Sequence, residues 1–418
     1  MAGMNIMIPL GIGSRFQKEG YPKPKPFVRV LGREMILWVV DSLKLGPDDT
    51  LIVVYNPTFL DMKPLMEIVR ERVPGVVLVE LPRPTLGAAE TVRFGLEGIS
   101  AKQRTRPCML VDGDAFYTVD IVGMYRAVSG RAGASFVFHD TQPKPIYSYV
   151  KRDGNSAVIT AIKEKVKISD WANTGCYCFK SGSDLLAYCA LIIEKGETQL
   201  SQDQKGEFYT SGVIKAMLDA GEPFEALVLA KDAMHVLGTP AQLVEFCQHW
   251  PAPVAQRFCF DIDNTLFTAP RVSGDYSTCE PLPQKLKMLR DLHAMGHYII
   301  LCTARRMRTH AGNVGAVIAD IGATTIATLA EENVPYHELH FGKPWAQFYI
   351  DDHAVSAYSD LDKELGYYPP SPPVVQTKYT KPPVHTARAA SKKDPSWLTV
   401  ALATYAVAAT ACILLRKK

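Results

Sequence analysis

The chain has 418 residues, of which 47% are hydrophobic, so it is long enough for two or three domains with full cores, and its composition excludes a disordered protein. Its 46 basic and 43 acidic residues give a formal charge of +3, which excludes a global field directed at nucleic acid. The nine cysteines form no CxxC pair, and Cys108, Cys259 and Cys302 lie in apolar runs, so we expect reduced core cysteines of a cytosolic protein rather than a zinc site or disulfide framework.

The first apolar segment, residues 5–10, lacks the basic start and long apolar core of a signal peptide and is typical of a strand. It runs into a Gly-Ile-Gly-Ser-Arg loop at 11–15, and a Pro-Lys-Pro element with Lys25 follows. Glycines at a strand end let backbone N–H groups approach a polyphosphate, and Arg15 and Lys25 supply positive charge. For these residues alone, an ordinary Gly/Pro turn with solvated basic side chains is the alternative.

Apolar strands and helical patterns then alternate, which predicts a mostly parallel sheet covered by helices. We expect strands at 50–55, 76–80 and 107–111, and helices near 60–72 and from Gly87 onward. The last of these strands ends in Asp112-Gly113-Asp114. Two carboxylates at a strand end can hold Mg²⁺, although a pair of turn aspartates is the commoner explanation when such a pair stands alone.

These elements together resemble the sugar-phosphate nucleotidyltransferases, which open with a G-x-G-[ST]-R loop, a P-K-P element and a V-x-G-x-x-M-[IL] turn, here residues 30–36. The resemblance covers about residues 1–245. It implies an α/β, Rossmann-like three-layer domain of the GT-A-like kind over residues 1–248. It also implies that Arg15 and Lys25 hold the triphosphate and that Asp114 binds Mg²⁺. The remaining implied contacts are nucleotide binding by Gly11, Gly13, Ser14, Gly87 and Ala88, and acceptor binding by Glu164, Lys165 and Asn173.

Three positions qualify this resemblance. Leu10 stands where the family usually has a small alanine. Val236, in the segment that ends in Gly-Thr-Pro, stands where the family often supplies a second metal carboxylate, which leaves open whether one or two metals are used. Lys165 lies in a run with Lys163 and Lys167, so a solvated surface lysine is its alternative interpretation.

A second region begins after the proline-bearing joint at 250–253. The apolar run at 258–260 is typical of a buried strand, and it delivers Asp261 and Asp263 at its carboxyl edge. Hydrolysis of a phosphate monoester through a covalent intermediate needs a carboxylate nucleophile and a nearby acid/base, and two aspartates two residues apart place both on one face of a strand end.

Three later elements complete a second pattern: Thr303 after an apolar strand, Lys343, and Asp351-Asp352 after Tyr349-Ile350, where we also expect an apolar strand. With the aspartates at 261 and 263, they resemble haloacid-dehalogenase-type (HAD) phosphatases, particularly those associated with capsule polysaccharide genes. The resemblance implies a second Rossmann-like three-layer domain, HAD-like and capless, over residues 256–366, because the interval from the first aspartate to Thr303 is only about forty residues. The implied roles are nucleophile for Asp261, general acid/base for Asp263, phosphate binding for Thr303 and Lys343, and a magnesium site from Asp261, Asp263, Asp351 and Asp352.

The C-terminal part has two segments. Residues 367–396 are rich in proline, small polar residues and basic residues, which is typical of a semi-extended linker. Residues 397–415 are uncharged and, at 1.5 Å per residue, reach roughly 28 Å as a helix, close to the hydrocarbon thickness of a bilayer. We expect a single-pass C-terminal membrane anchor with the catalytic domains facing the cytoplasm; a buried helix of a soluble protein is the alternative.

The leading hypothesis from the sequence is a membrane-tethered bifunctional enzyme. It would transfer a nucleoside monophosphate from an NTP to a sugar phosphate, with Mg²⁺ and release of pyrophosphate, and would hydrolyse a phosphate monoester of the same pathway. One alternative is a CTP-dependent cytidylyltransferase for phosphocholine, a phosphonate or a polyol phosphate. Another is a membrane scaffold with one inactive domain. No nucleic-acid partner is expected, and homo-oligomerisation stays open.

Overall fold

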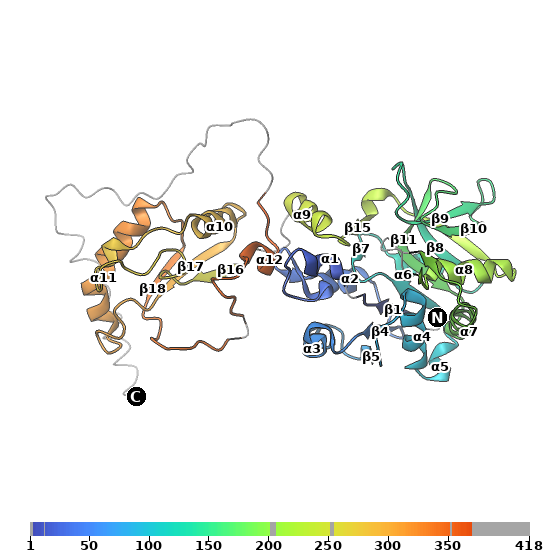
Figure 1. Cartoon of the computed structure of the whole chain (residues 1–418), viewed down its shortest axis with the longest axis horizontal. Helices are drawn as coiled ribbons and strands as arrows, with labels where there is room; N and C mark the ends of the chain where they lie inside the picture. The colour runs from blue at the N-terminus through green and yellow to red at the C-terminus, as the bar shows by residue number, and fades with distance from the viewer. Residues whose placement is uncertain (1–2, 12, 201–205, 251–254, 352, 370–418) are drawn as a thin grey trace. The chain divides into compact units, whose positions relative to one another are not determined.

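The computed structural model of the chain describes residues 3–11, 13–200, 206–250, 255–351 and 353–369 (Figure 1). By its contacts the chain divides into Met1–Pro370 and Ser371–Lys418. Nearly all of the predicted linker and the whole predicted membrane helix at 397–415 lie outside the described residues, as do Asp352 and residues 251–253 of the predicted joint. We call residues 3–250 the large-sheet region and residues 255–360 the small-sheet region.

A nine-stranded sheet organises the large-sheet region, with the order β10-β9-β11-β6-β1-β4-β5; in addition, β8 pairs with β11, and β14 pairs with β8. β1 runs parallel to both of its neighbours, β4 and β6, whereas β11 is antiparallel to β6. The strands are β1 (Asn5–Pro9), β4 (Thr50–Tyr55), β5 (Val77–Glu80), β6 (Cys108–Val111), β8 (Gly133–His139), β9 (Ser148–Arg152), β10 (Ile159–Glu164), β11 (Trp171–Phe179) and β14 (Phe224–Val228).

This sheet separates two hydrophobic cores. Successive side chains of a strand point to opposite faces, and in β1 the side chains of Ile6 and Ile8 enter one core while Met7 enters the other. Both faces are therefore buried, which is why the central strands are continuous apolar runs. The covering helices are α2 (Met35–Ser42), α3 (Met62–Arg72), α4 (Ala88–Glu97), α7 (Gly182–Glu194), α8 (Thr210–Asp219) and α9 (Pro240–His249).

The elements predicted from the first 111 residues are confirmed within one or two residues at each end. Strands lie at Asn5–Pro9, Thr50–Tyr55, Val77–Glu80 and Cys108–Val111, and helices at Met62–Arg72 and Ala88–Glu97. A short two-stranded sheet pairs β7 (Ala115–Tyr117) with β15 (Met234–Val236). It matters for function because it joins the loop after β6 to the segment that ends in Gly-Thr-Pro.

The small-sheet region contains a three-stranded parallel sheet in the order β16-β17-β18. Its strands are β16 (Arg257–Phe260), β17 (Tyr298–Thr303) and β18 (Glu338–Phe341), and its helices are α10 (Pro283–Ala294) and α11 (Val314–Glu331). Along the described chain no strand pairs with the outer edge of β16, and Cys259 is exposed there. The expectation of a core position is therefore wrong for Cys259, whereas Cys108 is buried.

The apolar residues before Asp351 do not form the strand that the sequence suggested. The described residues between Lys343 and Asp360 contain no strand or helix, and Phe348 and Ile350 are 84% and 100% exposed. An apolar run becomes a strand only when a neighbouring strand accepts its hydrogen bonds, and here it finds none.

Helix α11 is long and apolar enough to cross a membrane, the one such helix among the described residues. Three of its apolar side chains, Val317, Ile321 and Leu329, are buried in the region's own core, as expected for a covering helix.

Candidate active site

The loops that follow β1 and β6 meet at one edge of the large sheet. The two strands are parallel and adjacent, with Asn5 opposite Cys108. Their carboxyl ends therefore lie side by side, which is where open α/β sheets bind ligands. The loop after β1 leads to Lys25, and the loop after β6 carries Asp112 and Asp114.

Lys25 and Asp114 form the central contact of this site. The Lys25 ammonium touches the Asp114 carboxylate, and less than a fifth of each side chain is exposed. Gly13 permits the approach, because its φ is +68° and a Cβ there would lie 2.4 Å from the Cβ of Lys25. Another residue at position 13 would be strained and would displace the lysine. The structure thus brings together two residues that the sequence assigned to one phosphate and metal site.

Asp112 adds a second carboxylate beside Asp114. Its side chain reaches solvent, yet it is closely packed on the side of Gly175, where a Cβ would lie 2.4 Å from its Oδ2. Burial by the surrounding site, and then the charges of Asp114 and Glu164, raise the pKa of Asp112 to about 8, while Lys25 lowers it. Two adjacent carboxylates, one of which raises the pKa of the other, fit a divalent cation.

Magnesium commonly takes one or two protein carboxylates and completes its shell with water and phosphate oxygens. In the described part of the chain no three Asp, Glu, His or Cys side chains gather as a metal site would require. The donor set therefore fits a substrate-bridging Mg²⁺ on Asp112 and Asp114, rather than a cage made of protein alone.

Arg15, in the short helix α1 (Ser14–Lys18), is exposed near Tyr209. Burial raises the pKa of Tyr209, and among the neighbouring charges Arg15 lowers it. Lys165 approaches the same tyrosine, since its Nζ donates a 2.9 Å hydrogen bond to the Tyr209 hydroxyl. Tyr209 thus lies between the residue predicted for the triphosphate and the one predicted for the acceptor.

Glu164 and Asn173 have different surroundings. The Glu164 carboxylate accepts hydrogen bonds from the hydroxyls of Ser148 and Ser211. Asn173 is 2% exposed; its amide donates to Ser135 Oγ and two backbone carbonyls, and its Oδ1 accepts from the Gly175 N–H. Protein groups thus bond both the nitrogen and the oxygen of the Asn173 side-chain amide, at a point where the pairing register of β11 shifts. These bonds do not support the expected direct contact of Asn173 with an acceptor.

The segment predicted to lie beside the nucleotide base is held by backbone contacts. Gly87 has φ +133°, and a Cβ there would lie 2.6 Å from the backbone of Phe208. The Phe208 N–H donates to Leu86 O, and the Ala89 N–H donates to Phe208 O. Since Tyr209 follows Phe208, the segment with Gly87 and Ala88 is fixed next to the site.

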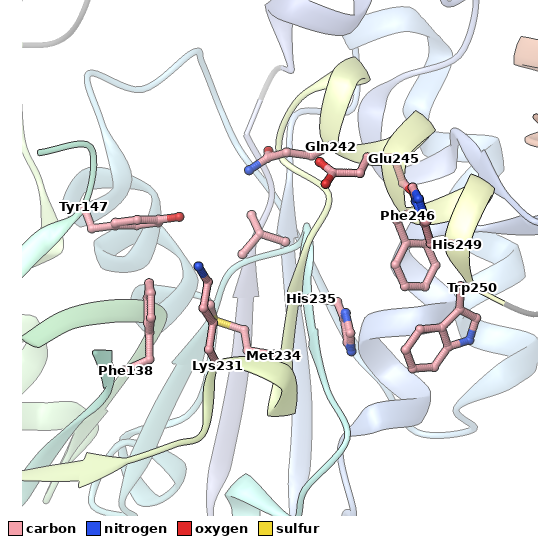
Figure 2. Close-up of a pocket in the computed structure, with 11 residues that line it drawn as sticks. Phe138, Tyr147, Lys231, Met234, His235, Gln242, Glu245, Phe246, His249 and Trp250 are labelled. Atoms are coloured by element: carbon pink, nitrogen blue, oxygen red, sulfur yellow. The ribbon is translucent and has the colours of Figure 1, made fainter. Parts of the chain in front are cut away.

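A cavity of about 360 Å³ lies between β15, α9 and the end of β8 (Figure 2). Val236, at the position where the family often has a metal carboxylate, lines it. The cavity adjoins Asp114 across Gly238, where a Cβ would lie 3.0 Å from Asp114 Oδ2 and 3.4 Å from Gln242 Oε1. Gly238 thus lies between Asp114 and Gln242, which lines the cavity.

The walls of this cavity are aromatic with a few polar groups. Figure 2 shows Phe138 and Tyr147 at one end and Phe246 and Trp250 at the other. The other lining residues are Lys231, Met234, His235, Val236, Gln242, Glu245 and His249. Such a mixture of apolar walls and few polar groups is typical of small-molecule sites.

Three polar groups of the cavity have no protein partner among the described residues. His235 Nε2 is buried without a hydrogen bond, and no ion pair engages Lys231 or the carboxylate of Glu245. Burial lowers the pKa of His235, which favours its neutral ring, and the charge of Asp232 opposes this shift. The cavity therefore offers the ammonium of Lys231 and the carboxylate of Glu245 to a ligand, whereas the ring of His235 packs against Phe116 and Trp250.

The nucleotidyl transferase family matches residues 6–248, more than half of the chain. The chain belongs to the nucleotidyl transferase family.

Among its relatives are the bifunctional protein GlmU of Thermodesulfovibrio yellowstonii, 23% identical over 236 residues, and that of Aquifex aeolicus, 23% identical over 246 residues. These alignments cover 54% and 56% of this chain and 47% and 49% of the relatives. The chain thus spans about half the length of the curated relatives it matches.

Solved structures with a similar chain include a nucleoside-diphosphate-sugar pyrophosphorylase from Vibrio cholerae RC9, with 23% identity and a TM-score of 0.47 over 58% of this chain and 98% of that one. An inositol-1-phosphate CTP transferase from T. maritima has 16% identity and a TM-score of 0.42 over 58% and 91%. The family match ends at residue 248, so the small-sheet region lies outside it.

The small-sheet region has its own polar site at the carboxyl ends of β16 and β17. Lys343 Nζ donates a 3.0 Å hydrogen bond to Asp261 Oδ2. Thr303 ends β17 with a fully buried side chain, and its backbone carbonyl accepts from the N–H of Lys343 at 3.2 Å. Lys343 is thus placed beside Asp261, the predicted nucleophile, whereas Thr303 meets Lys343 through its backbone and its hydroxyl accepts from the backbone N–H of Arg305.

Asp263 is held by a residue that sequence reasoning missed. The Arg305 guanidinium donates to both carboxylate oxygens of Asp263, with its Nη2 2.8 Å from Oδ1 and its Nε 3.1 Å from Oδ2. Arg305 is 2% exposed and also bonds Thr325 Oγ1. Burial raises the pKa of Asp263, and Arg305 lowers it. A single arginine in the Thr-Ala-Arg-Arg run carries no signal that marks it as the partner of an aspartate 42 positions away.

Of the remaining carboxylates of the predicted second magnesium site, only Asp351 lies among the described residues. Asp351 is exposed in the strand-free segment, where its Oδ1 accepts from the backbone N–H of His353, and Asp352 lies outside the described residues. Asp261 and Asp263 alone follow a strand, β16, whereas the apolar residues before Asp351 have no partner strand to place them beside it.

Proposed function

We propose that residues 6–248 transfer a nucleoside monophosphate from an NTP to a sugar phosphate and release pyrophosphate. The observation that carries this is the contact of Lys25 with Asp114 at the joined ends of β1 and β6, in a chain of the nucleotidyl transferase family. It pairs a cation for phosphate oxygens with a carboxylate for a metal ion in one place.

In the proposed reaction an oxygen of the acceptor phosphate attacks the α-phosphorus of the NTP. The bond between that phosphorus and the bridging oxygen to the β-phosphate breaks, and pyrophosphate leaves with the electron pair. Lys25 and Arg15 would hold the triphosphate, and Lys165, beside Tyr209, would hold the acceptor phosphate. Mg²⁺, held by Asp112 and Asp114, would supply charge neutralisation on the phosphates.

A sugar is favoured over phosphocholine or a phosphonate by the cavity beside Asp114. Lys231 would repel an organic cation, and Glu245 would repel an anion. The neutral hydroxyls of a sugar can accept a hydrogen bond from Lys231 and donate one to Glu245. The size, about 360 Å³, is at the small end of ligand sites.

The test is pyrophosphate release by the full chain with each of the four NTPs and a panel of sugar phosphates, phosphocholine, a phosphonate and a polyol phosphate. Turnover with a sugar phosphate alone is the expected result. Turnover with CTP and phosphocholine would replace the sugar proposal with the cytidylyltransferase alternative. Binding of nucleotide without turnover on the whole panel would favour a membrane scaffold with an inactive transferase domain.

We also propose that residues 256–366 hydrolyse a phosphate monoester. The supporting observation is the 3.0 Å bond from Lys343 to Asp261. Asp261 would attack phosphorus, and Asp263, once protonated and released from Arg305, would give its proton to the leaving alkoxide. Water would then hydrolyse the aspartyl phosphate to inorganic phosphate and return a proton to Asp263. Mg²⁺ binding by Asp261, Asp263, Asp351 and Asp352 belongs to this proposal.

Phosphate release from a monoester panel, lost in Asp261→Asn, would support the phosphatase proposal. Release that survives this substitution would contradict it.

Membrane anchoring by residues 397–415 is a further part of the proposal, supported by their uncharged composition. Sedimentation of the full chain with membranes in alkaline carbonate, and its release on deletion of 397–418, would support it.

A further inference from the structure

The last described residues, Leu361–Pro369, follow the small-sheet region but pack on the large-sheet region. We call them the strap; they comprise helix α12 (Leu361–Leu365) and four residues after it. The strap contacts the segment 19–32, which contains Lys25 and which we call the nucleotide loop. These contacts lie within the compact unit Met1–Pro370.

The strap bonds the backbone of the nucleotide loop downstream of Lys25. The N–H groups of Leu31 and Gly32 donate to the carbonyls of Gly366 at 2.9 Å and Leu365 at 2.8 Å. The Tyr367 hydroxyl donates to Leu31 O at 3.0 Å, and Tyr367 is 3% exposed. A buried set of three bonds is an attachment that water does not compete for easily.

Upstream of Lys25 the strap makes side-chain contacts. Lys363 Nζ donates to the carbonyl of Glu19 at 2.8 Å, and the hydroxyls of Tyr368 and Tyr21 lie 2.8 Å apart. The nucleotide loop is therefore attached on both sides of its functional lysine.

These attachments reach Lys25 through a stiff segment. Lys23 pairs with Glu364 at 3.8 Å, and prolines occupy positions 22, 24 and 26. Proline fixes φ, so a shift of Lys23 is passed to Lys25 rather than absorbed. Tyr21 also packs edge-on against Phe16, the neighbour of Arg15, with ring centroids 5.1 Å apart.

Gly366 allows the strap to lie directly against the backbone of the nucleotide loop. Its φ is +70°, and a Cβ there would lie 2.1 Å from the carbonyl oxygen of Arg29. A side chain at this position would push the strap off the nucleotide loop, because the atom it meets is backbone and has little freedom to move.

We propose that the strap positions Lys25 and Arg15 for the triphosphate, so nucleotide binding depends on residues beyond the family match, which ends at 248. This inference rests on the proposed nucleotidyltransfer. The strap residues are positioning residues, since none of them is placed against the reacting phosphates. A chain that ended after the large-sheet region would still contain the nucleotide loop, but it would lack the strap contacts that position Lys25 and Arg15.

The test uses the full chain and the substitution Gly366→Ala, with Gly296→Ala as matched control. Gly296 also follows a helix with φ +89°, but a Cβ there meets nothing within 4 Å. Two quantities are measured: hydrogen exchange of the Leu31 and Gly32 amides, and the affinity for each of the four NTPs with Mg²⁺ by calorimetry. A double-mutant cycle of Tyr21→Phe, Tyr368→Phe and the double variant adds substitutions that each remove one hydroxyl and keep the aromatic ring in place.

We expect Gly366→Ala to speed exchange of the two amides and to weaken nucleotide binding about tenfold, with no change in Gly296→Ala. The two tyrosine variants should weaken binding equally, and the double variant no more than either, because they remove the same bond. Faster exchange with unchanged nucleotide affinity would overturn the positioning role, and unchanged exchange would overturn the docking itself. If the wild type binds none of the four NTPs, the proposed function fails, and this inference fails with it for that separate reason.

Discussion

The Lys343 ammonium donates a 3.0 Å hydrogen bond to Asp261, although 82 residues separate them in the chain. The parallel pairing of β16 with β17 and of β17 with β18 produces this, because Lys343 follows Phe341, the last residue of β18. The region outside the family match therefore has an ion pair at the edge where parallel sheets bind ligands.

Lys343→Met should lower the rate of phosphate release by roughly a hundredfold or more, since a charge-stabilising contact of the transferring phosphoryl group is lost. Pyrophosphate release by the same protein should not change. Lys287→Met, which removes an exposed partner of Asp291, is the matched control for lost charge. Loss of both activities in Lys343→Met, measured side by side on one preparation, would speak against two independent sites.

Lys25→Met should lower kcat/KM for pyrophosphate release by roughly a hundredfold or more, because it removes the cation beside Asp114. The control is Lys102→Met, an exposed residue of α5 (Ala101–Arg104). Phosphatase activity should persist in both variants. Pyrophosphate release that survives in Lys25→Met would remove Lys25 from the catalytic machinery.

Arg305→Met should destabilise the small-sheet region by about 3–5 kcal/mol, because it leaves the Asp263 carboxylate without its buried partner. Chemical denaturation followed through this region measures the loss. Arg257→Met, whose ion pair with Glu338 is largely exposed, should change the free energy of unfolding by less than about 1 kcal/mol. Similar losses of unfolding free energy in the two variants would show that the buried ion pair of Arg305 stabilises the region no more than the exposed ion pair of Arg257.

Lys231→Met and Glu245→Gln should each raise the KM for a sugar phosphate about five- to tenfold, the cost of roughly one hydrogen bond, while the KM for NTP stays constant. Glu222→Gln, which removes an acid paired with Lys180 and not part of the cavity, is the control. An equal rise in both KM values would place the cavity outside the acceptor site. A rise seen only with phosphocholine, and only in Glu245→Gln, would reassign the cavity to a cationic acceptor.

Much of the large sheet could be predicted from local patterns. The strands at Thr50–Tyr55 and Cys108–Val111 are buried on both faces and flanked by turn residues, so a window of a few residues contains the signal. That Lys25 and Asp114 belong to one site was also expected, but through a family resemblance rather than through any local pattern; their direct contact was not.

Other parts of the site needed the folded chain. Arg305 and the strap residue Tyr367 act across separations of 42 and 336 positions, and no local pattern marks either of them. The strand expected before Asp351 failed for the complementary reason: its residues suit a strand, but among the described residues no neighbour pairs with them.

The amino-acid order by itself determined where apolar runs end in glycine, lysine and aspartate, and therefore which residues stand at strand ends. Only the tertiary structure decided which strand ends meet, which arginine holds Asp263, and that Gly366 lies against the backbone at Arg29. The reason is physical: burial and turn preferences act over a few residues, whereas pairing and packing join residues whose separation along the chain carries no information about their partner.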